Sequence, residues 1–113
     1  MSTITPVIPS GLTDGQALLV AQTATAGDTF HTAHATALDE VWMWAMNKHT
    51  ATVVLTVEYG GAGAGQNLKV DLAPNEIALV LPGARLTNSK TVKAFAGTTN
   101  VIALFGNVNR YTA

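Results

Sequence analysis

A glycine-rich stretch, Gly60 to Gly65, follows a run of β-branched residues and raises the question of a phosphate-binding loop. A dinucleotide loop of the G-x-G-x-x-G kind needs a helix directly after the glycines, because the N-terminal amides of that helix hold the pyrophosphate. Here residues 66–72 alternate apolar and polar as a strand does, and the residue three after Gly63 is Gln66. The sequence G-x-x-x-x-G-K-[ST] does not occur either. We therefore expect a hairpin tip between two strands, and no nucleotide site.

Two histidines three positions apart, His31 and His34, are the next candidates, since imidazole is a common metal ligand. On a strand, side chains three apart point to opposite faces, so the two rings reach one metal only across a turn. The nearby carboxylates of Asp28, Asp39 and Glu40 follow no fixed metal-ligand spacing. We expect surface or interface histidines and no metal site.

Catalytic chemistry finds little support in the residue types. The chain has no cysteine, no G-x-S-x-G and no H-E-x-x-H, and no two of its seven Asp and Glu residues form a recognisable acid–base pair. We expect a protein that is not an enzyme and that carries no cofactor.

The segment 41–46 holds both tryptophans of the chain, Trp42 and Trp44. On a strand these two side chains share one face with Met46, and the opposite face carries Val41, Met43 and Ala45. A pair of indoles on one face can stack on sugars or bases. Tryptophan and methionine are also favoured in cores and subunit interfaces, which is the interpretation we favour. Trp42 and Trp44 are therefore candidate interface residues.

The elements that position these residues are short β runs separated by turn residues. About eight runs recur at intervals of 8–12 residues, a spacing typical of sandwiches and barrels. They cover residues 16–23, 29–34, 41–46, 50–59, 67–72, 76–81, 91–96 and 101–108. No window shows a convincing helical period. The prediction is an all-β, single-domain antiparallel β-sandwich of about eight strands, with a jelly-roll-like arrangement as one candidate topology.

Alternation within the runs predicts which side chains point inward. The predicted core contains Val53, Leu55, Val57, Leu79, Leu81, Val101, Ala103 and Phe105. Two runs, 41–46 and 101–105, are apolar on both faces, which is typical of strands covered on both sides. One cover is the core, and we expect the other to be a neighbouring subunit.

Residues 1–15 read as an extended N-terminal arm that precedes a β-sandwich domain of residues 16–113. Pro6 and Pro9 block helix formation and remove hydrogen-bond donors. Ile4, Val7 and Ile8 form a small apolar strip, so the arm is either a frayed terminus or a docking segment. These five residues join the two tryptophans as candidate protein-interface residues.

The composition of the chain indicates which classes of partner to expect. Only 12% of residues are charged, where roughly 25% is typical, and the net charge is −1. Such a surface is poorly suited to a phosphate backbone, and it suits a protein whose surface is covered by partners. No run approaches the ~20 apolar residues of a membrane span, and the N-terminus lacks the pattern of a secretory signal. We expect neither nucleic acid nor membrane as a partner.

Two long segments carry a resemblance: GDTFHTAHATALDEVWMWAMNKHTATVVLTVEYGG and LPGARLTNSKTVKAFAGTTNVIALFGNVNRY. Over residues 27–111 the chain resembles small virion proteins of tailed bacteriophages, through a diffuse pattern rather than a short motif. The resemblance implies a structural role as a capsid decoration (cement) protein on the virion surface, assembled in the host cytoplasm. Its implied partners are the major capsid protein and further copies of itself, with a trimer favoured because decoration proteins commonly sit at threefold positions.

Two alternatives stay open. One is a tail, neck or head-fibre component that contacts the host surface or a carbohydrate through Trp42 and Trp44. The other is an enzyme or ligand-binding domain of unrelated origin. The resemblance offers no catalytic residues to assign to this chain.

Overall fold

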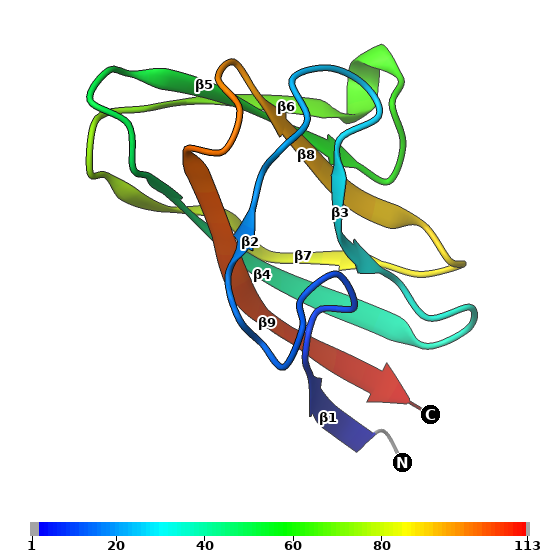
Figure 1. The fold of residues 1–113 in the computed structure, drawn as a ribbon. Helices are drawn as coiled ribbons and strands as arrows, with labels where there is room; N and C mark the ends of the chain where they lie inside the picture. Colours follow the sequence, from blue (N-terminus) through cyan, green and yellow to red (C-terminus); the bar gives the residue numbers. More distant parts are fainter. Residues whose placement is uncertain (1–2, 113) are drawn as a thin grey trace.

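The computed structural model describes residues 3–112, within which nine strands form two antiparallel sheets (Figure 1). Sheet A contains β1 (Thr3–Val7), β2 (Leu18–Leu19), β4 (Leu38–Asn47), β7 (Ile77–Leu86) and β9 (Ile102–Thr112). Sheet B contains β3 (Asp28–Thr32), β5 (Val53–Tyr59), β6 (Asn67–Leu72) and β8 (Thr91–Ala96). Residues 1, 2 and 113, which belong to the predicted arm and domain, lie outside the described part. The predicted all-β antiparallel sandwich is confirmed.

Strand pairing is nested along the chain. β5 pairs with β6, β4 with β7, β3 with β8 and β2 with β9, and these successive pairs alternate between the two sheets. A chain with this pairing is one long hairpin rolled upon itself, which is the jelly-roll arrangement. In Figure 1 the strands of sheet B form the upper layer and those of sheet A the lower one.

The tip of the rolled hairpin is the glycine-rich stretch. It joins β5 to β6 through a single 3₁₀ turn, η1 (Ala64–Gln66), and β6 then pairs antiparallel with β5. Gly60 adopts a φ of 81°, a left-handed conformation that favours glycine. The prediction that these glycines connect two strands is confirmed. Within residues 3–112, no helix has the length and apolar character that crossing a membrane requires.

Strand β4 shows the alternation that the sequence predicts. Val41, Met43 and Ala45 are fully buried between the sheets, while Trp42 and Trp44 point to the other side of sheet A and are half-buried. The core continues through sheet B, where Val53, Leu55 and Val57 are buried as predicted. Other large core side chains are Phe30, Leu72, Leu81, Val92, Ile102, Leu104 and Val108.

The predicted face of β9 is wrong. Ile102, Leu104 and Val108 point into the core, whereas Ala103 and Phe105 point outward, and Val101 precedes the strand and packs at the margin of the core. Register explains this, because Leu104 pairs with buried Ala45 of β4. Residues 101–105 are apolar on both faces, and the polar residues that mark the outer side, Asn107 and Asn109, come only later in the strand.

Leu79 is a second correction, since its side chain is outward and 41% exposed while Leu81 is buried as predicted. The register between β4 and β7 shifts between Met43 and Trp44, which inserts one extra residue into β7 between these two leucines. A β-bulge of this kind interrupts the two-residue alternation, so residues two apart point to opposite faces.

The segment before residue 16 joins sheet A at its edge. β1 pairs antiparallel with the end of β9, so that Ile4 lies opposite Tyr111. The loop that follows packs on the domain, where Leu12 is 7% exposed and the Gly11 N–H donates to the Phe30 carbonyl. From residue 3 onward the predicted arm is therefore an edge strand and a packed loop.

Candidate interaction surface

The outer face of sheet A is apolar and aromatic. Strand register places on this face, on the side away from the core, residues from all five strands: Ile4, Pro6, Leu19, Trp42, Trp44, Met46, Ile77, Leu79, Pro82 and Phe105. We call this surface the aromatic face. An antiparallel sheet with one solvated face normally carries polar residues there, so this composition needs an explanation.

Three aromatic rings form a row at its centre. The Trp42 and Trp44 ring centroids lie 6.5 Å apart with planes inclined by 24°, and those of Trp44 and Phe105 lie 6.0 Å apart with planes inclined by 11°. Trp42 and Trp44 are alternate residues of β4, and Phe105 lies opposite Trp44 on β9. The two strands thus present three nearly parallel rings.

The position of the Trp42 indole is fixed from below and from the side. Gly83 has a φ of 78°, and a Cβ at this position would lie 2.9 Å from the indole Cζ2. The ring therefore lies directly over a position that only glycine fits. The indole Nε1–H donates to the Glu40 carboxylate at 2.8 Å, which fixes the ring's rotation.

A charged and hydrogen-bonded group of side chains lies at one end of the aromatic face. There the Glu40 carboxylate accepts hydrogen bonds from Trp42, Asn109 and Tyr111 and lies 3.7 Å from the Arg85 guanidinium. The hydrogen bond from Trp42 is the largest of the causes that hold the pKa of Glu40 below its usual value. Arg85 also lies over the Tyr111 ring, 5.6 Å from its centroid. The charges at this end are thus paired within the chain.

Exposed aliphatic side chains extend the ring row on both sides. Ile77 and Leu79 on β7 are 57% and 41% exposed, and Leu19 on β2 is 40% exposed. Leu79 lies opposite Trp44 and Ile77 opposite Met46, so the aliphatic and aromatic parts are continuous.

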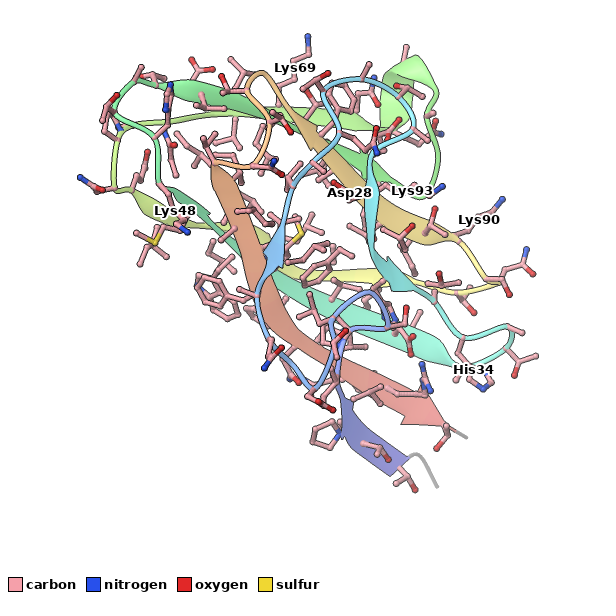
Figure 2. The ribbon with its side chains drawn as sticks, in the orientation of Figure 1. Asp28, His34, Lys48, Lys69, Lys90 and Lys93 are labelled. Atoms are coloured by element: carbon pink, nitrogen blue, oxygen red, sulfur yellow. The ribbon has the colours of Figure 1, made fainter. Side chains whose placement is uncertain are left out.

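The outer face of sheet B is different in kind. Its strands carry Lys69, Asp71, Lys93 and several threonines on the side away from the core, together with the apolar Val54 and Phe95. Figure 2 shows Lys69, Lys90 and Lys93 extending outward around sheet B. This face has the polar character expected of a solvated sheet surface.

Sheet B also holds two polar atoms without partners. Glu58 is 2% exposed; its Oε1 accepts the Gly27 N–H at 2.6 Å, while its Oε2 is buried and has no hydrogen-bond partner. The Oδ1 of Asn67, the residue opposite on β6, is also buried without a partner. Such groups reduce stability unless a donor reaches them.

A buried ionic cluster links the two sheets. His31 of β3 contributes its Nε2 to a 2.7 Å contact with the Asp39 carboxylate on β4, and Arg110 of β9 donates to both oxygens of that carboxylate at 2.8 and 3.0 Å. The Ser10 N–H donates to His31 Nδ1, so the proton lies on Nε2 and points at Asp39. Burial would raise the pKa of Asp39, but the hydrogen bonds from Arg110, His31 and the His34 N–H outweigh it and lower the pKa to about 2.

The expectation of surface or interface histidines is wrong for His31, which is 1% exposed, and correct for His34, which is exposed. The spacing of His31 and His34 did not reveal their common partner, because spacing concerns only where the two rings lie relative to each other. Instead the His31 ring and the His34 backbone N–H both bond to Asp39. Because the His31 ring nitrogens and the Asp39 oxygens are all hydrogen-bonded, the cluster serves to hold the sheets together. Among residues 3–112 no three His, Cys, Asp or Glu side chains gather as metal ligands would.

The residues that the sequence named as interface candidates divide into two groups. Ile4, Pro6, Trp42 and Trp44 share the aromatic face, and Ile4 is 57% exposed. Of the others, Ile8 is 53% exposed, Val7 is half-buried and Pro9 is buried. Phe105, Leu79 and Ile77 belong to the aromatic face although the sequence did not name them as interface residues. The sequence signal for Phe105 was the run 101–105, which is apolar on both faces. Leu79 and Ile77 had no such signal, because the bulge that turns Leu79 outward follows from pairing with β4.

Comparison with known proteins assigns the chain to no family. No protein-family model matches the chain, and no curated protein is significantly similar to it.

Proposed function

We propose that this protein is a structural virion protein that binds and stabilises a bacteriophage capsid as an oligomer, most simply a trimer. The observation that supports a structural role is the aromatic face, which is too apolar and too continuous for a surface left in water. Large exposed apolar patches on soluble proteins mark sites of protein association. The resemblance of residues 27–111 to small phage virion proteins is the reason for proposing a capsid as the assembly that this protein joins.

The fold is consistent with a protein that acts through its surfaces. A rolled hairpin with an interior ionic cluster gives a rigid body, and rigid partners lose little conformational entropy on association. Repetition around an oligomer then converts modest contacts of each subunit into high avidity.

The experiment is cosedimentation of the purified protein with empty shells of the phage that encodes it, followed by cryo-EM of the decorated particles. We expect saturable binding with a fixed number of copies at one class of lattice position. Absence of binding to intact and expanded shells would contradict the proposal.

A second candidate is a tail, neck or head-fibre component that contacts a carbohydrate on the host. The observation in its favour is the row of three nearly parallel rings, beside which Asn107 and Asn109 provide hydrogen-bonding groups on the same face. Aromatic rings with adjacent polar groups suit flat ring ligands. Saturable glycan binding that is lost in Trp44→Ala would favour this candidate over capsid decoration.

A further inference from the structure

We infer that the aromatic face is covered by a second copy of this chain. The inference rests on the proposed function, because it names the partner of the surface that supports that function. The alternatives for this surface are a shell protein and a glycan, and three properties of the face favour a second copy.

The first property is the charge balance. Glu40 and Arg85 lie at the same end of the face and pair with each other, so they leave no unbalanced charge at that end. A strongly acidic or basic partner would find no counter-charge across the central strands. A second copy brings a surface of the same apolar character, so the contact involves no like-charge repulsion across its centre.

The second property is size. A stable interface buries roughly 800 Å² on each partner. The chain exposes 5832 Å², so such an interface would occupy about a seventh of its surface. The aromatic face extends over all five strands of sheet A, from Leu19 on β2 to Ile77 on β7, and so spans the full width of the sheet.

The third property is composition. The centre of the face consists of Trp, Phe, Met and Leu without a lysine or glutamate, which is the composition of an interface core. Its polar groups lie at the rim, where Tyr111, Asn109 and Arg85 surround Glu40. A flat aromatic centre with a paired polar rim is typical of a contact between folded proteins.

The test uses two matched substitutions on opposite sheets. Leu79 on the aromatic face and Val54 on the outer face of sheet B are both 41% exposed strand residues. Because both side chains are already partly in water, Leu79→Lys and Val54→Lys should each leave the fold intact, which circular dichroism and thermal unfolding check. The probe is the chain itself, measured by sedimentation equilibrium up to about 100 µM, where an interface of micromolar Kd is populated.

We expect the unaltered protein to associate, with a mass of three subunits if the proposed trimer is correct. Leu79→Lys should weaken association by ~30-fold or more, because it places an unpaired charge in an apolar contact beside Trp44, and Val54→Lys should change it by less than about threefold. Equal effects of the two substitutions, or no effect of Leu79→Lys, would overturn the inference.

Capsid binding, measured separately, distinguishes the two proposals. If the protein is monomeric at every concentration and only Leu79→Lys loses shell binding, a shell protein covers this face. The inference then fails, and the proposed function stands. A protein that associates through Leu79 but binds no shell leaves the inference standing and the proposed function without support.

Discussion

The two sheets of this molecule are alike on their inner faces and opposite on their outer ones. Inside, both supply fully buried aliphatic side chains, such as Leu104 from sheet A and Leu55 from sheet B. Outside, sheet A presents Trp42, Trp44 and Phe105, whereas sheet B presents lysines, threonines and Asp71. One fold thus carries two different outer surfaces. The inward-facing residues therefore reflect the requirements of folding, and the outward-facing residues reflect whether a face contacts solvent or a partner.

The largest expected effect tests whether the inner faces of the two sheets contribute equally to stability. Leu55→Ala and Leu104→Ala should each lower the free energy of unfolding by ~2–5 kcal/mol, because each leaves a cavity between the sheets. Phe105→Ala, one residue along β9 but on the outer side, should cost less than about 1.5 kcal/mol in a monomeric Leu79→Lys background. Urea denaturation measures all three. A larger loss for Phe105→Ala than for Leu104→Ala would reverse the assignment of faces on β9.

The next effect concerns the ionic cluster that joins the two sheets. The pKa of Asp39 in the folded protein is about 2, below its ordinary value. A lowered pKa means that the ionised carboxylate stabilises the fold above its unfolded pKa of ~3.9, and that this stability is lost as the pH falls toward 2. Asp39→Asn should therefore cost about 2–3 kcal/mol at pH 7 and much less near pH 2.

Denaturation of the unaltered protein and of Asp39→Asn at several pH values measures this difference. Asp71→Asn is the matched control, because Asp71 is an exposed carboxylate on the outer side of sheet B. If the two variants showed the same dependence on acid, the cluster would not connect the sheets energetically.

A smaller effect belongs to the outer side of sheet B. Glu58→Gln keeps an oxygen for the Gly27 N–H and replaces the unpartnered Oε2 with an amide N–H₂, on the strand position opposite the unpartnered Asn67 oxygen. We expect an increase in the free energy of unfolding of ~0.5–1.5 kcal/mol, the usual value of one hydrogen bond. Thermal and urea unfolding check the sign. A clear decrease would mean that the carboxylate has a cationic partner in solution, with Lys93 on the adjacent strand the first to examine.

The smallest effect is spectroscopic and belongs to the outer side of sheet A. The chain contains two tryptophans, and both lie on the aromatic face, so intrinsic tryptophan fluorescence reports on this face alone. Dilution from about 100 µM to about 1 µM, across the micromolar Kd range, should shift the emission to longer wavelength and increase quenching by acrylamide. Leu79→Lys should show the dilute spectrum at every concentration, and Val54→Lys should follow the unaltered protein. Spectra that do not depend on concentration would mean that the rings keep one environment.

Much of this protein could be predicted from its sequence by itself. Turn residues at regular spacing determined an all-β sandwich, because Gly, Asn and Pro favour turns. The bounds were less certain, since β7 continues through Pro82 and Gly83 to Leu86 instead of ending at residue 81. Alternation determined the inner face of β5, where Val53, Leu55 and Val57 are buried. On β4 alternation determined which residues share a face, but not which face is the inner one. The strand after the glycines determined that Gly60 to Gly65 form a hairpin tip, because a phosphate loop needs a helix there.

The tertiary structure decided the rest. The faces of β9 and β7 depended on register with β4 and on a bulge beside Leu79, because residues 101–105 and 77–81 are apolar on both faces and carry no local mark of their inner side. The burial of His31 depended on its contact with Asp39 of β4, and Asp39 in turn accepts hydrogen bonds from Arg110, 71 residues further along the chain. The nested pairing, too, joins strands far apart in sequence, and residue spacing within a strand carries no information about which distant strand lies beside it. The aromatic face formed only when these pairings brought Trp44, Phe105 and Leu79 together on one sheet.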